Sequence, residues 1–472
     1  MPTAHITTID PTSGNVLATY PAITPAEIEK VLDAAHTAQR DWAATPIPDR
    51  AAMLTKVAGR LRADREALAR LAVAEMGKPI GEALGEVDKC AWVCDYYAEH
   101  GPAFLADQLV GTEAMRSWVA HEPLGVILAV MPWNFPFWQV FRFAAPVLLA
   151  GNTALLKHSP NVTGTALAIE QIFHKAGLPP EAFRTLVIAE ADVPQVTAEL
   201  IADDRVAAVS LTGSERAGSA VGSIAGREIK KSLLELGGSD PFVILDDADL
   251  DLAVASAIRS RFINTGQSCL AAKRFIVHDA VVDQFARRFT DAVTALRVGD
   301  PADPGTEIGP MARPDLVDAL ERQVSASVAA GAVVRAGGRR LDRPGAWFAP
   351  TVISDVSLEM PVMAEETFGP VAAIIRARDD AEAVALANAT RFGLGASVWG
   401  RDTERALAVG RQIASGALFI NAVVASDPRL PFGGTKRSGF GRELGAAGAL
   451  EFTNTRTYYV GAGIPPTGPA TE

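Results

Sequence analysis

The hydrophobic pattern of the first hundred residues is typical of helices. Apolar residues recur at helical spacing over residues 25–40, where Thr24 is placed to cap the helix and Pro25 to occupy its first position. Residues 49–75 and 80–98 repeat this spacing. The pattern therefore predicts a helical N-terminal part.

From Gly125 the pattern changes to short apolar runs that alternate with helical stretches. The predicted order is strand 125–131, helix 136–149, strand 154–157, helix 164–176, strand 185–189, helix 193–202 and strand 206–211. Alternation of this kind indicates βαβ units and a parallel, doubly wound sheet. A second block of alternation follows Glu235 and ends near Gly445. The fold class predicted is α/β.

Composition narrows the class of protein. The chain has 472 residues, of which 49% are hydrophobic and 21% charged, so the bulk of it is expected to fold into two to four domains. A net charge of −11 argues against a nucleic-acid or anionic-membrane partner. Three cysteines make no disulfide framework, no signal peptide is visible, and the longest apolar run is too short to span a bilayer. We therefore expect a reduced protein of the cytoplasm.

A glycine turn follows the predicted strand 206–211. Gly213 and Ser214 open a helix that is rich in small residues. Glycine lets backbone N–H groups approach a phosphate, and a helix N-terminus favours an anion. Alone, the pattern fits phosphate binding or a plain strand–helix turn.

Three residues have the chemistry of a catalytic site. Cys269 follows a polar stretch and has two cations soon after, a setting that favours the thiolate. Glu235 lies among leucines, where desolvation raises a carboxyl pKa toward that of a general base. Asn134 lies in a bend between two prolines and could donate to an oxyanion. Each residue also fits a structural role.

Several metal-binding and catalytic motifs are missing from the sequence. The seven histidines are scattered without metal-ligand spacing, and neither a GxSxG nor a Walker A string occurs. Cys90 and Cys94 lie four apart in a predicted helix, where packing explains them better than a metal or redox pair. No metal is therefore expected.

As a set, seven strings resemble those of the aldehyde dehydrogenase superfamily, in the family's order and over nearly the whole chain. They are PWNFP (132–136), LLKHSP (155–160), LTGSE (211–215), LELGGSDPF (234–242), NTGQSC (264–269), EETFGP (365–370) and LPFGGTKRSGFGRELG (430–445). Their surroundings are most similar to the NADP-dependent bacterial succinate-semialdehyde dehydrogenases.

The resemblance implies a three-part architecture. Residues 1–107 and 124–236 would form a Rossmann-like cofactor domain, and 237–445 an α/β catalytic domain. Residues 108–123 and 446–466 would form a small β oligomerisation element, followed by a flexible tail at 467–472. A homodimer or homotetramer is expected, since the hairpin would otherwise leave exposed strand edges.

The resemblance also assigns catalytic roles. Cys269 would attack the aldehyde to give a thiohemiacetal and then a thioester. Asn134 and the backbone N–H of Cys269 would hold the oxyanion, and Glu235 would activate the water that releases the acid.

The cofactor positions follow in the same way. They are Trp133, Leu236 and Phe368 around the nicotinamide, Glu366 on its ribose, Gly213 and Ser214 at the pyrophosphate, and Lys157 near the adenosine ribose. NAD-preferring relatives carry a glutamate where this chain has Pro160, which cannot repel a 2′-phosphate. Ser159 and Lys157 could instead bind that phosphate, so NADP is favoured and NAD stays possible. Alternatively, Pro160 only loosens the selectivity.

For the substrate, Arg142 lies eight residues after Asn134, about two helical turns away. The resemblance places it in the substrate tunnel, with Trp138, Ser426 and Phe432. A buried arginine needs an anion, which the distal carboxylate of a semialdehyde or a protein carboxylate would supply. Many relatives carry a second arginine where this chain has Ile263, and Arg261 two residues earlier is a possible substitute.

The leading hypothesis is therefore NAD(P)-dependent oxidation of a semialdehyde, with succinic semialdehyde the favoured small-molecule partner. A broad short-chain or glutaric semialdehyde dehydrogenase is the nearest alternative. Two other classes fit less well. A thiol hydrolase that needs no cofactor would leave the nucleotide positions without a role, and a non-catalytic protein that kept the fold would leave Cys269 without one.

Overall fold

The N-terminal part of the chain is a hairpin followed by helices. In the computed structural model, which describes residues 4–463, strands β1 (His5–Ile9) and β2 (Val16–Pro21) pair antiparallel. The helices that follow are α1 (Pro25–Ala44), α2 (Ile47–Ala63), α3 (Arg65–Met76) and α4 (Ile80–Phe104). Thr24 caps α1 through a capping box with Glu27, as its position predicts. The single helix predicted at 49–75 is two helices, because the backbone leaves helical geometry at Asp64, where ψ is 11°.

The first large sheet has six strands in the order β17-β9-β8-β5-β6-β7. They are β5 (Val126–Val130), β6 (Thr153–Lys157), β7 (Phe183–Thr185), β8 (Val206–Thr212), β9 (Lys231–Glu235) and β17 (Gly439–Phe440). All neighbours pair parallel except β17, which pairs antiparallel with β9. The strand predicted at 185–189 lies earlier, at β7, because Leu186 and Ile188 are buried beyond the ladder in a hydrophobic cluster.

Helices cover both faces of this sheet: α5 (Trp138–Leu149), α6 (Thr163–Ala176), α7 (Val193–Ala202) and α8 (Glu215–Arg227). Residues Val126–Ala129 of β5 are fully buried, as expected of a parallel strand covered on both sides. The strand order reverses beside β5, and ligands of doubly wound sheets bind at the carboxyl ends of the strands near such a reversal.

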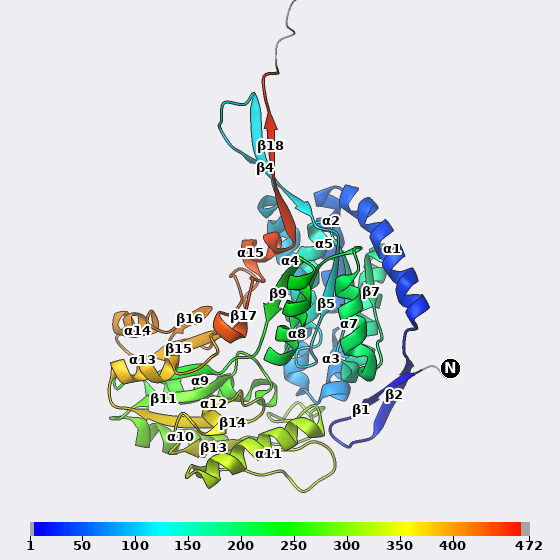
Figure 1. Ribbon diagram of the computed structural model, residues 1–472. Coiled ribbons are helices and arrows are strands. Elements are labelled where there is room, and N and C mark those ends of the chain that lie inside the picture. The colour runs from blue at the N-terminus through cyan, green and yellow to red at the C-terminus, as the bar shows by residue number, and fades with distance from the viewer. Residues whose placement is uncertain (1–3, 464–472) are drawn as a thin grey trace, which may run out of the picture.

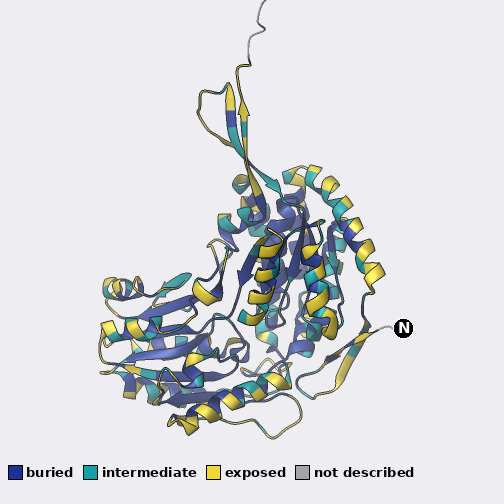
Figure 2. Ribbon diagram, in the orientation of Figure 1, coloured by how far each residue is buried: buried dark blue, intermediate teal, exposed yellow. Residues whose placement is uncertain are grey.

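The second large sheet has seven strands in the order β12-β13-β14-β11-β10-β15-β16. They are β10 (Asp240–Ile244), β11 (Ala272–His278), β12 (Val333–Ala336), β13 (Thr351–Ser354), β14 (Val371–Ala377), β15 (Gly395–Trp399) and β16 (Ala417–Ile420). Its helices are α9 (Leu250–Phe262), α10 (Val282–Thr294), α11 (Pro314–Ala329), α12 (Pro361–Ala364), α13 (Asp380–Asn388) and α14 (Thr403–Gly410). Figure 2 shows the strands of both sheets buried and the outer helix faces exposed. The α/β class predicted from the sequence is confirmed.

A third sheet, β18-β4-β3, forms an arm that projects from the body (Figure 1). It joins β3 (Gln108–Leu109), β4 (Arg116–Pro123) and β18 (Thr453–Val460). The helix α15 (Gly445–Glu451) precedes β18 and packs on α4 and α5, away from the arm. The last part of the predicted oligomerisation element, 464–466, and the predicted tail, 467–472, lie outside the described residues.

Candidate active site

Cys269 lies where the two large sheets meet. It precedes β11 of the second sheet, while the bend that carries Asn134 follows the carboxyl end of β5 in the first sheet. The two segments are joined by hydrogen bonds: Asn134 Nδ2 donates to the carbonyl of Gln267 (3.1 Å), and Asn264 Nδ2 donates to the carbonyl of Asn134 (2.7 Å). The structure therefore brings the predicted oxyanion donor to the loop of the predicted nucleophile.

The loop before Cys269 has an unusual backbone. Asn264, Thr265 and Gly266 all have positive φ, at 53°, 56° and 74°. A Cβ on Gly266 would lie 2.3 Å from the carbonyl oxygen of Gly369, so only glycine fits there. Glu82 holds the loop from α4 by accepting the backbone N–H of Asn264 (2.6 Å).

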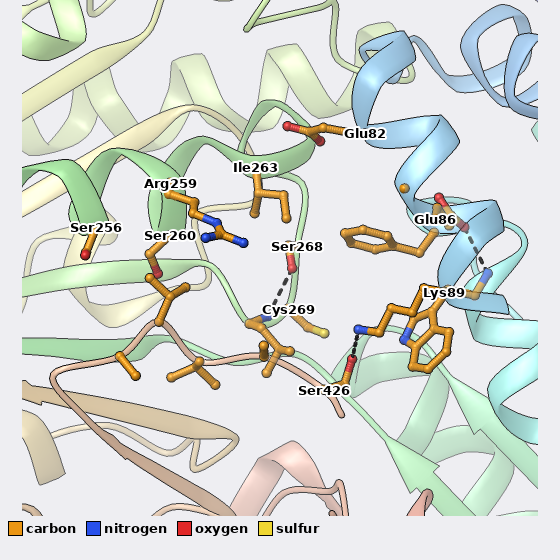
Figure 3. Close-up of a pocket in the computed structure, with 18 of the residues that line it drawn as sticks. Glu82, Glu86, Lys89, Ser256, Arg259, Ser260, Ile263, Ser268, Cys269 and Ser426 are labelled. Atoms are coloured by element: carbon orange, nitrogen blue, oxygen red, sulfur yellow. Dashed lines mark hydrogen bonds between the residues drawn. The ribbon is translucent and has the colours of Figure 1, made fainter. Parts of the chain in front are cut away.

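A cavity of about 800 Å³ opens beside Cys269 (Figure 3). Of the predicted substrate positions, Trp138, Arg142 and Ser426 line it. The fourth, Phe432, packs under Arg142, whose guanidinium lies 4.7 Å from the centre of the Phe432 ring. Aromatic and apolar side chains otherwise dominate this end of the cavity, which suits a short aliphatic chain.

The cations that follow Cys269 in the sequence could favour its thiolate, but burial of the side chain acts against that form. Burial raises the pKa of Cys269 to about 11, and the positive charges of Lys273 and Arg142 offset burial only in part. Lys273 Nζ donates to the carbonyls of Ser268 (3.0 Å) and Cys269 (2.8 Å). Arg274, the second nearby cation in sequence, donates to backbone carbonyls and faces away from the thiol.

Glu235 is the last residue of β9, and its carboxylate is buried. Burial, and secondly the charge of Glu443, raise the pKa of Glu235 well above its ordinary value. Among residues 4–463, neither of its carboxylate oxygens has a hydrogen-bond partner. A Cβ on Gly433 would lie 2.8 Å from Glu235 Oε1, so glycine leaves the carboxylate room. These features suit a general base that awaits a water molecule.

Arg142 does not have the unpaired charge on which its predicted role depended. Its guanidinium forms an ion pair with Glu443, and both side chains are buried. Arg261 does not replace the missing second arginine either. It is fully buried and donates to the carbonyls of Gly266, Thr367 and Gly369, whereas Ile263 lines the cavity with an apolar side chain.

The predicted nucleotide positions gather at the carboxyl edge of the first sheet. Ser214 caps α8 by accepting the N–H of Ala217 (3.3 Å), so the free N–H groups of that helix end face outward beside Gly213. Leu236 packs on α8 at Gly218, where a Cβ would lie 2.4 Å from it. This close strand–helix approach is what a nucleotide-binding turn requires.

The nicotinamide positions lie across the same edge. The rings of Trp133 and Phe368 meet edge to face with their centres 5.7 Å apart. Glu366 accepts the N–H of Gly238 (3.0 Å) and lies 3.4 Å from Lys273 Nζ. Both contacts hold the Glu366 carboxylate in place.

The adenosine-side positions lie at the end of β6. Lys157 is buried, and burial lowers its pKa to about 8. No carboxylate among the described residues lies within 4.0 Å of its ammonium group. Ser159 and Pro160 line a second cavity of about 550 Å³. A buried cation that forms no direct ion pair, and that is only partly stabilised by the more distant charge of Glu190, fits the phosphate of a dinucleotide.

Four charged residues that line the cavity at Cys269 were not predicted from the sequence: Glu82, Glu86 and Lys89 from α4, and Arg259 from α9. Glu443, the partner of Arg142, was not predicted either. Charged residues at 82, 86 and 89 recur at helical spacing beside the buried stripe of α4, and this recurrence was the available signal. The sequence held no comparable signal for Glu443, because its ion pair with Arg142 joins positions 301 residues apart.

Two absences complete the description. Within residues 4–463 no group of three histidine, cysteine or acidic side chains is arranged to hold a metal ion. No helix in the same range has the length and apolar character needed to cross a membrane. Cys90 and Cys94 are free and buried, and burial raises the pKa of both thiols.

A cysteine in a cavity between two α/β sheets, one of them with the strand reversal of a nucleotide-binding sheet, is an arrangement found in dehydrogenases. The chain belongs to the aldehyde dehydrogenase family, whose family model matches residues 2–458. The predicted family and enzyme class are thereby confirmed.

Individual relatives match over nearly the full length. The chain is 50% identical over 455 residues to a protein of Synechocystis sp. named probable succinate-semialdehyde dehydrogenase [NADP(+)], covering 96% of this chain and 99% of that protein. It is 46% identical over 458 residues to the Escherichia coli succinate semialdehyde dehydrogenase [NAD(P)+] Sad, covering 97% and 98%.

Among solved structures, succinic semialdehyde dehydrogenase from Streptococcus pyogenes in complex with NADP+ matches with a TM-score of 0.93 and 38% identity, covering 97% of this chain and 100% of that one. The roles of individual residues in this chain stay predictions.

Proposed function

We propose that this enzyme oxidises a short semialdehyde carboxylate, succinic semialdehyde, to the dicarboxylic acid with NADP. The observation that carries the proposal is the cavity at Cys269, which is lined by the cations Lys89 and Arg259 as well as by apolar side chains. An aldehyde with a distal carboxylate matches such a lining. The names of the relatives from Synechocystis and Streptococcus support the same substrate and cofactor.

The chemistry follows from this chain's own side chains. Cys269 gives its proton to solvent, its sulfur bonds to the aldehyde carbon, and the electron pair of the carbonyl bond moves to the oxygen, which becomes an oxyanion. That oxyanion accepts hydrogen bonds from the Cys269 backbone N–H and from Asn134 Nδ2, whose second proton is not used by Gln267. The nucleotide, when bound, supplies the acceptor for the hydride.

Release of the product requires a base. Loss of the hydride leaves a thioester on Cys269. Glu235 takes a proton from water, the resulting hydroxide bonds to the thioester carbon, and the carbon–sulfur bond breaks. The carboxylic acid leaves, and the Cys269 sulfur takes the proton that Glu235 removed from water, so both side chains return to their starting forms.

The preference for NADP rests on the end of β6. Lys157 is buried without an acidic partner in the described part of the chain, and it would pair with the 2′-phosphate of NADP. The Ser159 hydroxyl, which donates to Asn161 Oδ1 (2.7 Å), would turn to donate to the phosphate, and Pro160 presents no carboxylate to repel it. We further propose that the enzyme acts in the cytoplasm as a homodimer or homotetramer.

The test compares reduction of NADP and NAD by the purified protein with succinic semialdehyde, beside Cys269→Ala. We expect turnover with NADP at least about tenfold above that with NAD, because one charge-assisted contact contributes this much. Cys269→Ala should abolish it. Turnover of simple aldehydes alone would contradict the substrate, and ester hydrolysis without any nucleotide would favour a thiol hydrolase.

A further inference from the structure

The cations around the cavity at Cys269 differ in how their charge is compensated. Arg142 is paired with Glu443. Arg259 lies at an exposed position on α9. Lys89 of α4 is half-buried, and no described carboxylate lies within 4.0 Å of its ammonium group. Lys89 is thus the enclosed cation without an ion-pair partner in the part of the chain that the structure describes.

The ammonium group of Lys89 is nevertheless fixed in position. Lys89 Nζ donates a hydrogen bond to Ser426 Oγ (2.8 Å) and lies 4.3 Å from the centre of the Trp138 ring. Figure 3 shows the Lys89 side chain and the Cys269 thiol reaching into the same cavity, with Ser426 bonded to Lys89. Three elements therefore converge on this ammonium: α4, α5 and the loop after β16.

The surroundings make the positive charge of Lys89 costly without an anion. Burial, and next the charge of Arg142, lower the pKa of Lys89 to about 8. Cys90 and Glu86 on its own helix and Asp427 in the loop after β16 act in the opposite direction without cancelling this effect. A bound carboxylate would stabilise the charged form, because an opposite charge within a few ångströms favours ionisation.

We propose that Lys89, with Ser426, is the receptor for the distal carboxylate of the substrate, so that Lys89 selects semialdehyde acids over neutral aldehydes. The ammonium uses one of its three N–H groups to donate to Ser426, which leaves two N–H groups to donate to the carboxylate. The Ser426 hydroxyl accepts from Lys89 and can donate its own proton to the same carboxylate. This inference rests on the proposed function and names the group that recognises the substrate.

The other basic residues fit this role less well. Arg142 already pairs with the carboxylate of Glu443, and Arg261 already donates to backbone carbonyls. Arg259 has the charge, but its exposed position leaves water to compete for it. Many relatives carry an arginine at the position of Ile263. In this chain Lys89, which lies on a different helix, would supply the positive charge instead.

The test measures kcat/KM for succinic semialdehyde and for butanal, which has the same four carbons and no carboxylate. The variants are Lys89→Met, Lys89→Arg and Arg259→Met. We expect Lys89→Met to lower kcat/KM for the semialdehyde by roughly 10- to 100-fold, the range of a hydrogen bond to a charged group, and to change kcat/KM for butanal by a much smaller factor. Lys89→Arg should recover part of the loss, and Arg259→Met should have a smaller effect that fades with added salt.

A second readout is the ratio of the two kcat/KM values as a function of pH. Both substrates need the same Cys269 and Glu235 chemistry, which cancels in the ratio. The Lys89 ammonium is charged below a pKa of about 8, so the preference for the semialdehyde should be complete at pH 7 and fall above pH 8. In Lys89→Met the ratio should not depend on pH in this range.

Each other result overturns the inference. Equal losses for butanal and semialdehyde in Lys89→Met would mean a structural role. A loss in Arg259→Met but not in Lys89→Met would move the carboxylate to Arg259. A wild-type enzyme that oxidises butanal but not the semialdehyde would contradict the proposed function as well. If the wild type oxidises the semialdehyde and Lys89→Met has the same kcat/KM, only this inference is contradicted.

Discussion

At the scale of single residues, the carboxylate of Glu235 shows how burial prepares a base. Its pKa is raised by burial and then by Glu443, so the carboxylate form is present only above that raised pKa. We therefore expect the steady-state rate of the wild-type enzyme to fall as the pH falls through it. Glu235→Gln should release about one equivalent of reduced cofactor per site and then turn over roughly 10²- to 10⁴-fold more slowly, because the thioester persists.

Rapid mixing at several pH values would check both parts of the Glu235 prediction. The Gln variant keeps the size of the side chain and cannot accept the proton from water. Its residual rate should therefore lack the acid limb of the wild-type profile. A variant that shows no burst, or that keeps the same acid limb, would assign the base to another residue.

The sequence suggests which residues have catalytic chemistry, but it does not show their electrostatic surroundings. Motifs located Cys269, Glu235 and Asn134. The raised pKa of Cys269 depends on its burial in the folded chain, and the effect of Lys273 depends on where that side chain lies, so neither is a property of local sequence. The partner of Arg142 lies 301 residues along the chain, so only the fold reveals the pair.

At the scale of elements, Glu86 of α4 organises the start of α5. Its carboxylate accepts the N–H groups of Phe137 (2.8 Å) and Trp138 (2.9 Å) and forms a buried ion pair with Lys78. It thereby supplies the cap that the first turn of α5 lacks. Since Asn134 lies just before that turn, Glu86 also positions the predicted oxyanion donor.

We expect Glu86→Ala to lower the free energy of unfolding by about 3–5 kcal/mol, because it leaves Lys78 buried without a counter-charge. The double variant Lys78→Met/Glu86→Gln removes both charges and keeps an oxygen for the α5 N–H groups, so most of the stability should return. Denaturant unfolding of the three proteins, with kcat measured beside it, checks this. A double variant less stable than Glu86→Ala would contradict the coupling.

At the same scale, the spacing of hydrophobic residues predicted which segments are helices and which are strands. The predictions were wrong where contacts between distant segments override that local pattern. The N-cap at Thr24 depends on local sequence and was predicted correctly, whereas its capping box with Glu27 was not part of the prediction. The strand predicted at 185–189 was misplaced, because buried Leu186 and Ile188 serve the core rather than the ladder. The left-handed loop before Cys269 was not predicted, since its conformation depends on Glu82 and Asn134.

At the scale of the whole molecule, the projecting arm is the feature that a single chain leaves unexplained. Trp118 and Tyr458 stack with their ring centres 4.6 Å apart, so the β4–β18 ladder is firm. Yet apolar side chains remain on its surface, with Leu109 80% and Tyr459 59% exposed. β18 and β3 are the edges of the sheet, and unpaired strand edges favour association with another chain.

We therefore expect sedimentation of the wild-type protein to give a dimer or tetramer of the 49.7 kDa chain. Leu109→Asp/Tyr459→Asp should shift the mass toward the monomer, because it places charges on the apolar surface of the arm. Ile229→Asp is the matched control, since Ile229 is 95% exposed but lies in the turn before β9. A monomeric wild type, or equal dissociation in both variants, would show that the arm does not mediate assembly.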